Sequence, residues 1–362
     1  MTIELDDYVP ILKWRQGEYQ ALMRVKDSVK GKIVPLIVVP PIEYDFETQS
    51  LKKTAQEHIE PFSKRLFDKW GARTVLIDFH SSMILEKMDS GDYVPLHIFS
   101  ELRNKGCKGI PVTTLEREMA YNGQVKLIVA EDSSGFCLRV TLAQVIDPSF
   151  NSSVVDRCNL IGVDLDEVDL VLDLEAPDSF EPYAIFSNLI ITAISRINNL
   201  AKYRSFVLSG MSLKMREVGK PGAEVPRHEW ILYKLILGGL NGMRVPAYGD
   251  YTIETPAFSS LDMRMMKPAG KIAYTCDDTW LIPKGGAFRG SEHQMVDHCN
   301  AIIASGKYAG PIFSFGDKRI EDTSVGTEGC GNLSTWKQVG VNHHIETVVF
   351  QLANLRAGSA VP

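Results

Sequence analysis

Short apolar runs rich in Val, Ile and Leu recur along the first 255 residues, and a stretch with the apolar spacing of a helix follows most of them. The eight runs are 8–14, 32–45, 74–80, 109–114, 136–142, 168–175, 204–212 and 244–253. Continuous apolar strands that alternate with helices are typical of a parallel sheet covered by helices on both faces. Eight such units in about 250 residues predict a closed (β/α)8 TIM-like barrel, with an open doubly wound sheet as the alternative.

The pattern changes after Ile253. Residues 270–290 alternate and turn on glycines, which predicts a β-hairpin or ribbon, and 292–306 has the pattern of a helix. We expect a strand and turn at 312–320 and a last helix from about 333 to 355. The chain is therefore predicted to have a barrel over 1–255 and a C-terminal α+β extension over 256–362 that packs on the barrel.

Two segments do not fit clearly into the predicted alternation of strands and helices. Residues 125–132, "VKLIVAED", are predicted to be either a paired strand before the fifth barrel strand or a short insertion. Residues 218–226, "VGKPGAEVP", contain the Gly and Pro typical of a mobile loop, and we expect a lid over a ligand or a contact with a partner.

Composition and charge narrow the class of protein. The chain has 362 residues, of which 44% are apolar and 23% charged, as in ordinary globular proteins. The acidic start "MTIELDDY" and the lack of an apolar run of eighteen residues indicate a cytoplasmic protein without a membrane span. A net charge of −6 argues against a protein that coats nucleic acid. The six cysteines form no C-x-x-C pair, so we expect free thiols.

Polar side chains follow the predicted barrel strands. In a barrel, residues at the carboxyl ends of the strands face the ligand. Lys13 and Arg139 could hold a small ligand that carries a phosphate or carboxylate group. Asp78, Asp173 and Asp250 could act as general acid or base, or bind a hard cation such as Mg²⁺, although the sequence leaves any metal or cofactor unknown. The alternative is a closed network of salt bridges without a ligand.

A second group of candidates lies in the extension. If the extension folds over the barrel mouth, Arg289, Asp317 and one of the adjacent histidines His343 and His344 would complete the pocket. Adjacent side chains on a helix point about 100° apart, so one histidine is expected at the site and the other in packing. A purely polar interface role is the alternative. Asn342 could cap a helix that begins at the histidine pair, if the segment before it is not already helical.

Several motifs in order resemble the phage-type Beta protein family, which occurs in phages and in bacterial mobile or defence-linked loci. They are "YVPILKWRQGEYQAL" at 8–22, "PLIVVPP" at 35–41, "VDLVLDL" at 168–174, "RHEW" at 227–230, "YGDY" at 248–251, "FSFGD" at 313–317 and "WKQVGVNHH" at 336–344. The resemblance implies that twelve residues occupy the recurring polar positions of the family. They are Lys13, Glu18, Asp78, Arg139, Asp173, Arg227, Glu229, Asp250, Arg289, Asp317, His343 and His344. It also implies a role in conflict between bacteriophage and host, such as antiviral defence, and assigns no reaction.

Two functions fit these observations. One is a cytoplasmic barrel enzyme that binds a small anionic ligand at the strand ends and hydrolyses it by acid–base catalysis. The other is a non-catalytic recognition or sensor module whose polar barrel mouth binds a protein partner.

Overall fold

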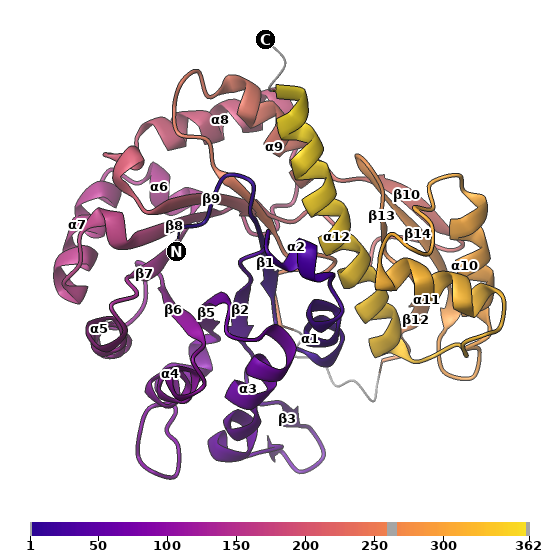
Figure 1. Cartoon of the computed structure of the whole chain (residues 1–362), viewed down its shortest axis with the longest axis horizontal. Helices are drawn as coiled ribbons and strands as arrows, with labels where there is room; N and C mark the ends of the chain where they lie inside the picture. Colours follow the sequence, from indigo (N-terminus) through magenta and orange to yellow (C-terminus); the bar gives the residue numbers. More distant parts are fainter. Residues whose placement is uncertain (1, 259–265, 360–362) are drawn as a thin grey trace. The chain divides into compact units, whose positions relative to one another are not determined.

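Eight parallel strands form a closed barrel in the computed structural model, which describes residues 2–258 and 266–359 (Figure 1). Around the barrel the strands follow the order β1-β11-β9-β8-β7-β6-β5-β2, and β1 pairs with both β11 and β2 to close it. The predicted TIM-like barrel is confirmed. Its strands are β1 (Tyr8–Leu12), β2 (Leu36–Val39), β5 (Thr74–Phe79), β6 (Lys108–Thr113), β7 (Phe136–Thr141), β8 (Val168–Asp173), β9 (Ser205–Gly210) and β11 (Ala247–Asp250).

Each predicted apolar run coincides with one of these strands, and only β6 begins outside its run, one residue earlier at Lys108. Every residue of β5, β8 and β9 is buried, because one face lines the barrel and the other packs on helices. The run at 32–45 is the least regular of the eight. Its barrel strand covers only 36–39, and its end forms β3 (Tyr44–Asp45), which pairs with β4 (Ser50–Leu51) in a separate hairpin.

Local signals explain where the helices begin and end. Thr54 accepts a hydrogen bond from the Glu57 backbone and Glu57 bonds back to the Thr54 backbone, which is a capping box at the start of α3. Gly162, with φ of 91°, ends α7 in the left-handed conformation. The helices between the strands are α3 (Ala55–Trp70), α4 (Val94–Asn104), α5 (Met119–Asp132), α6 (Leu142–Ile146), α7 (Phe150–Ile161), α8 (Tyr183–Ser195) and α9 (His228–Gly239).

The chain divides into two compact units. The barrel unit comprises the residues up to Trp14, Val34–Gly210 and Leu232–Asp250, and the second unit comprises Arg15–Ile33, Met211–Ile231 and the chain from Tyr251 onward. Two segments that lie within the barrel sequence thus belong to the second unit. The expectation of an extension over 256–362 that packs on the barrel stays a prediction.

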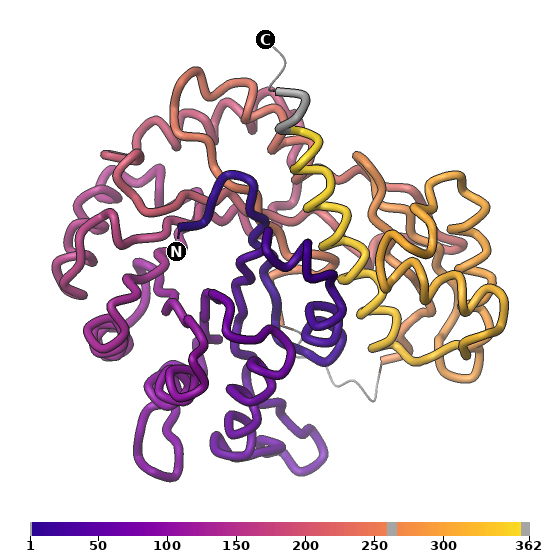
Figure 2. The backbone as a smooth tube through the Cα atoms, viewed as in Figure 1, coloured from indigo at the N-terminus to yellow at the C-terminus, as the bar shows by residue number. Residues whose placement is uncertain are grey.

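The second unit combines helices with a small antiparallel sheet. In this sheet β14 (Thr279–Ala287) pairs with β10 (Gly222–Pro226), β12 (Ala269–Lys271) and β13 (Tyr274–Thr275), which agrees with the predicted ribbon. The last helix is α12 (Leu333–Ser359), whose yellow part is one uninterrupted coil in Figure 2. The other helices of this unit are α1 (Gln16–Met23), α2 (Asp27–Lys30), α10 (Gln294–Ala304) and α11 (Phe315–Ser324).

Three local predictions were wrong. Residues 125–132 belong to helix α5, since Tyr121, Val125, Ile128 and Val129 recur at helical spacing and are buried. Residues 315–320 are helical, because the Ser314 hydroxyl accepts a hydrogen bond from the Asp317 backbone and caps α11. The third error concerns 218–226, where β10 replaces the end of the expected loop. The last helix begins at 333, as predicted.

Strand β10 is paired along its length. It forms an antiparallel ladder with β14 from Gly222↔Pro283 to Pro226↔Thr279, so this part of the expected lid is held in a sheet. The last helix begins at Leu333, about three turns before the histidine pair, so Asn342 does not cap it. Instead Asn342 accepts a hydrogen bond from the Gly316 backbone and donates one to the Ala21 carbonyl.

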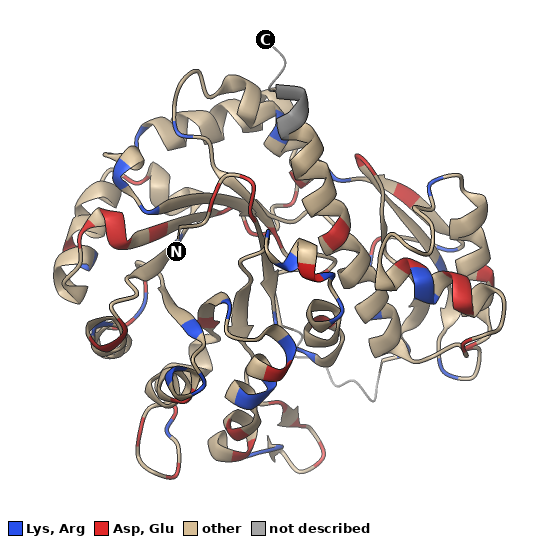
Figure 3. Ribbon diagram, viewed as in Figure 1, with Lys and Arg blue, Asp and Glu red and all other residues tan. Residues whose placement is uncertain are grey.

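Charged residues of both signs are interspersed along the described helices (Figure 3). Within residues 2–258 and 266–359, no helix is long and apolar enough to cross a bilayer.

Gly222 gives a direct test of the β10–β14 pairing. Its φ is +119°, and an added Cβ would lie 2.1 Å from the Ile282 carbonyl oxygen. Gly222→Ala should lower the free energy of unfolding by about 2 kcal/mol or more, because alanine disfavours this backbone and collides with β14. Urea denaturation of the full chain measures the change.

The matched control is Gly219→Ala, where an added Cβ would meet no atom within 4 Å. This variant should change the unfolding free energy by less than about 1 kcal/mol. Equal losses in the two variants would contradict the pairing.

Candidate functional site

Three of the predicted site residues meet on one face of the barrel sheet. Arg139, on β7, lies between Asp78 on β5 and Asp173 at the end of β8. Its Nη1 donates to Asp78 Oδ2 at 2.8 Å, while Nε and Nη2 donate to Asp173 Oδ2 at 2.9 and 2.6 Å. We call this group the Asp78–Arg139–Asp173 cluster. Charge-assisted bonds of this length are the strong class of hydrogen bond in proteins.

Neighbouring groups fix the two carboxylates. Arg117, in the loop after β6, donates from Nη2 to Asp78 Oδ1 at 3.0 Å and to the Phe79 carbonyl oxygen at 2.6 Å. On Asp173, Oδ1 accepts from the Ser209 hydroxyl at 3.1 Å and from the Glu175 backbone at 2.8 Å. Two arginines thus face two aspartates, so the cluster is balanced in charge.

Two titratable groups beside the cluster are perturbed. Partial burial, and then the charge of Asp173, raise the pKa of the Glu175 carboxyl above its ordinary value, although much of the residue is exposed. Burial, and then the charge of Arg117, lower the pKa of the His80 imidazole. A carboxyl group with a raised pKa next to a second carboxylate is the usual arrangement for a group that gives or takes a proton.

The backbone is strained just beyond three of the barrel strands. Trp14, Glu175 and Thr252 have φ of 52°, 56° and 59°, and each lies two residues after the last residue of β1, β8 or β11. Such conformations cost non-glycine residues about 1–3 kcal/mol and are concentrated at functional sites. The strain therefore marks the carboxyl ends of the strands.

Asp250 lies on the other face of the sheet. Asp173, Ser209 and Gly249 are register neighbours, and successive strand residues point to opposite faces. Asp250 therefore points away from the Asp78–Arg139–Asp173 cluster, and its carboxylate accepts a hydrogen bond from the Tyr8 hydroxyl.

Lys13 lies at the carboxyl end of β1 and is nearly fully buried. It directly follows β1 and is 5% exposed. A ligand-binding role for Lys13 and a catalytic role for Asp250 stay predictions.

His343 and Asp317 form a buried network in the second unit. His343 Nδ1 lies 2.8 Å from Asp317 Oδ2, and His343 Nε2 lies 2.8 Å from the Thr275 carbonyl oxygen. Ser314 and Tyr274 donate their hydroxyl hydrogens to Asp317 at 2.5 and 2.7 Å, and the Tyr274 ring stacks on His343 at 3.9 Å. His343 Nε2 also lies 3.3 Å from the Thr347 hydroxyl, so oxygens surround both ring nitrogens.

The contacts of Asp317, including the one with His343, change the pKa of its carboxyl. Burial acts to raise the pKa of the Asp317 carboxyl, but the charge of His343 and the three hydrogen bonds outweigh it, and the pKa lies below its ordinary value. Asp317 and His343 are almost fully buried, at 0% and 2% side-chain exposure. The contacts describe a polar core, and catalytic or ligand-binding roles for the two residues stay predictions.

His344 and Arg227 flank the same tryptophan. The His344 ring stacks on Trp280 at 4.9 Å, and its Nδ1 lies 2.9 Å from the Thr275 hydroxyl. The Arg227 guanidinium lies 5.5 Å from the Trp280 ring and 5.4 Å from the Trp230 ring, a cation–π arrangement.

Arg227 is wholly buried and its charge has a nearby partner. Its Nη1 donates to the carbonyl oxygens of Cys276 and Asp277, and Nε lies 3.8 Å from Glu229 Oε1. The other Glu229 oxygen, Oε2, accepts from the Ser212 backbone at 3.2 Å. A ligand-binding role for Arg227 and Glu229 stays a prediction.

Glu18 and Arg289 differ sharply in exposure. Glu18, on α1, is buried and pairs at 3.5 Å with Lys337 of α12, which also pairs with Glu254 at 3.0 Å. Arg289 is exposed in the turn after β14. Their ligand-binding roles stay predictions.

The residue types that bind metal ions are dispersed in the described part of the chain. There, no group of three or more His, Cys, Asp or Glu side chains is arranged to hold a metal ion. The position between Asp78 and Asp173 is filled by Arg139. All six cysteines are free thiols, four of them buried.

The architecture defines a (β/α)8 barrel protein with an ionic cluster at the carboxyl ends of its strands. The chain belongs to the Beta protein family, whose model matches residues 8–350. No protein with a curated description matches the sequence.

Solved structures similar to this chain include two enzymes. The 3-dehydroquinate dehydratase from Enterococcus faecalis is 11% identical, with 69% of this chain and 90% of that chain covered and a TM-score of 0.36. The catalytic domain of a hyperthermophilic chitinase from Pyrococcus furiosus is 8% identical, with 68% and 83% covered and a TM-score of 0.35. The assignment of the fold rests on the strand order and pairing of the barrel itself.

The sequence did not predict Arg117 and Tyr8 as partners of the site residues. Arg117 lies four residues after the end of β6, in a loop where a charged residue carries no special signal. Tyr8 opens β1 and has the pattern of a core aromatic residue, although its hydroxyl bonds to Asp250. Glu175 was visible as a polar residue at a strand end.

Asp317→Asn tests the buried network. Because the carboxylate is stabilised in the folded state, its contribution is present above its unfolded pKa of about 3.9 and is lost as the pH falls through the lower folded value. The substitution should lower the unfolding free energy at pH 7 by about 3–5 kcal/mol, since it removes the buried carboxylate that pairs with His343. It should also flatten the fall in stability on acidification.

The control is Asp322→Asn on the same helix, whose carboxylate pairs with Lys318 at 2.5 Å near the surface. Its loss should be below about 1 kcal/mol. Denaturant unfolding at pH 7 and at acid pH compares the two. Similar curves for both variants would count against a buried ion pair at Asp317.

Proposed function

We propose that this barrel binds a small anionic ligand, carrying a phosphate or carboxylate group, at the carboxyl ends of its strands and hydrolyses it by acid–base catalysis. The observation that carries the proposal is the unequal exposure of the Asp78–Arg139–Asp173 cluster. The side chain of Arg139 is 17% exposed, whereas those of Asp78 and Asp173 are 3% and 2% exposed. A ligand that approaches the cluster therefore meets the guanidinium first.

Guanidinium chemistry favours an anionic ligand. Arg139 is always charged, and its planar donors match the oxygens of a carboxylate or phosphate. The two buried aspartates hold the guanidinium in place, so little rotational freedom is lost when a ligand binds. In this proposal Asp78 and Asp173 are positioning residues, and Lys13, which follows β1, adds positive charge at the same ends of the strands.

Glu175 is the proposed proton donor and acceptor. Its pKa is raised by burial and then by Asp173, its backbone is fixed by a hydrogen bond to the Asp173 carboxylate, and its φ is +56°. A carboxyl group that keeps its proton closer to neutral pH can protonate a leaving oxygen and then activate water.

A non-catalytic recognition module is the second candidate. The charge balance of two arginines and two aspartates favours it, since a closed network needs no ligand. For either candidate we propose a cytoplasmic role in conflict between bacteriophage and host, as the resemblance of its motifs implies.

Ligand-dependent thermal stability distinguishes the two candidates. Thermal unfolding is measured for wild type, Arg139→Lys and the control Arg196→Ala, which changes an exposed arginine of the barrel unit. Each protein is tested with inorganic phosphate, sugar phosphates, nucleotides and Mg²⁺, and again with a chelator. A ligand at a hundredfold excess over its Kd adds about 2.7 kcal/mol to the native state. We expect a rise in Tm for wild type and Arg196→Ala that is absent in Arg139→Lys.

Arg139→Lys keeps a positive charge between the aspartates, so the variant should fold, but it loses the planar donors. A rise in Tm that persists in Arg139→Lys would contradict binding at the cluster. No rise with any compound in wild type would favour the recognition module.

Glu175→Gln tests the catalytic step. With the ligand found in the melting experiment as substrate, the variant should hydrolyse it about 100-fold more slowly, because general acid–base catalysis contributes at least this factor. Its Kd should change by less than about threefold, since Glu175 is not the proposed anion binder. An unchanged rate would overturn the role of Glu175 while leaving the binding site intact.

A further inference from the structure

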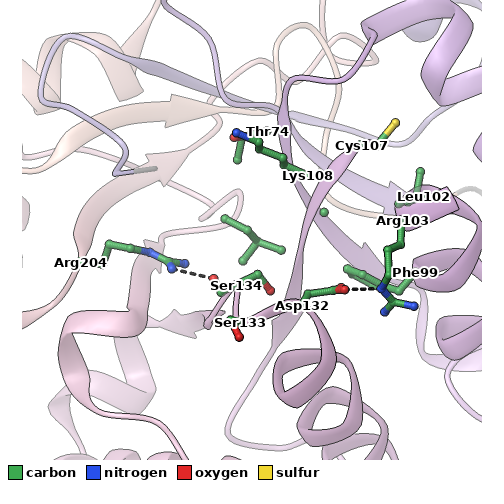
Figure 4. Close-up of a pocket in the computed structure, with 12 residues that line it drawn as sticks. Thr74, Phe99, Leu102, Arg103, Cys107, Lys108, Asp132, Ser133, Ser134 and Arg204 are labelled. Atoms are coloured by element: carbon green, nitrogen blue, oxygen red, sulfur yellow. Dashed lines mark hydrogen bonds and ion pairs between the residues drawn. The ribbon is translucent and has the colours of Figure 1, made fainter. Parts of the chain in front are cut away.

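We propose that the barrel has a second ligand site at the amino ends of its strands, which takes a small molecule with an anionic head and an apolar body. A pocket of about 320 Å³ lies there, where β5 and β6 begin (Figure 4). Its volume is at the lower end of the range for small-molecule sites. Since the Asp78–Arg139–Asp173 cluster lies toward the opposite ends of the same strands, the two sites are separate.

One side of the pocket is apolar. Phe99 and Leu102 of α4 and Ile110 of β6 line it, and all three are buried. An apolar wall of this kind favours the hydrocarbon body of a ligand, because contact with it removes apolar surface from water.

Three cations surround the opening. Arg103, Lys108 and Arg204 reach it from α4, β6 and the residue before β9, and in Figure 4 they lie around the turn that contains Ser133 and Ser134. One lining residue, Asp132, carries a negative charge. The two arginines also pair with the acidic side chains Glu131, Asp132 and Asp169, which offset their charge.

The three cations differ in their partners. Arg103 pairs with Glu131 and Asp132, and Arg204 donates from Nε and Nη2 to the two oxygens of the buried Asp169 at 2.9 and 2.6 Å. Lys108 forms no ion pair or hydrogen bond with any side chain within the described residues. Lys108 is therefore the cation that is available to a ligand without a loss of structure.

The polar side of the pocket is rigid. Arg204 Nη1 donates to the Ser134 carbonyl oxygen at 2.6 Å, and Ser133 ends α5 with φ of 48°. At Gly135, an added Cβ would lie 2.0 Å from the Glu167 carbonyl oxygen, so the turn is packed closely against the start of β8. A preformed wall reduces the entropy lost on binding.

The ligand chemistry follows from these walls. A carboxylate or phosphate monoester head would pair with the Lys108 ammonium and lie near the hydroxyls of Ser133 and Ser134. An aromatic ring or short alkyl body would contact Phe99 and Leu102. Benzoate and phenyl phosphate are the two probes that represent the carboxylate and the phosphate form.

Calorimetric titration of the full chain tests the site. The probes are benzoate and phenyl phosphate. Two control compounds are inorganic phosphate, which lacks the apolar part of the probes, and benzyl alcohol, which lacks their negative charge. The variants are Lys108→Met, Lys108→Arg and the control Lys105→Met, a lysine three residues earlier that does not line the pocket. We expect Lys108→Met to raise the Kd of at least one charged probe about tenfold, whereas Lys108→Arg and Lys105→Met stay within about twofold of wild type.

Three outcomes would overturn the proposal: no binding of either probe at about 10 mM, equal binding by Lys108→Met and wild type, or tighter binding of benzyl alcohol than of the charged probes. Titration of Arg139→Lys separates this site from the carboxyl ends of the strands. An unchanged Kd in Arg139→Lys together with a loss in Lys108→Met supports the amino-end site, and the reverse pattern rejects it.

Discussion

Closure of the barrel by β1, which pairs with β2 on one side and β11 on the other, is the constraint on which the rest of the barrel unit depends. A closed parallel barrel has no free edge, and it brings the carboxyl ends of all its strands to one rim. Side chains from β5, β7 and β8 that are far apart in sequence therefore meet. The Asp78–Arg139–Asp173 cluster spans the consecutive strands β5 to β8 of this barrel.

Buried charge is present toward both ends of the barrel. Arg139 joins two aspartates near the carboxyl ends, and Arg204 binds the buried Asp169 near the amino ends, with apolar residues such as Leu170 and Leu172 between them along β8. Charges in such places cost several kcal/mol in desolvation unless they are paired. The pairing accounts for the stability of both groups, and the partial exposure of Arg139 leaves it open to a ligand.

The sequence was sufficient to predict the barrel because strands buried on both faces are continuously apolar, and such runs are visible without tertiary information. It failed at 125–132 and 312–320, where a helix and a strand have similar short apolar patterns. The polar strand ends predicted Asp78, Arg139 and Asp173, but strand register decides that Asp250 faces the other way. Asp317 and His343 meet through contacts between α11 and α12 that no local pattern encodes.

Titration of the Glu175 carboxyl by ¹³C NMR, with Glu175→Gln to assign the signal, tests the proposed acid–base role most directly. The account predicts a pKa above the ordinary glutamate value of about 4.3, and a partial return toward that value in Asp173→Asn, because the charge of Asp173 is one cause of the shift. A Glu175 carboxyl that titrates at the ordinary value, with no response to Asp173→Asn, would contradict it.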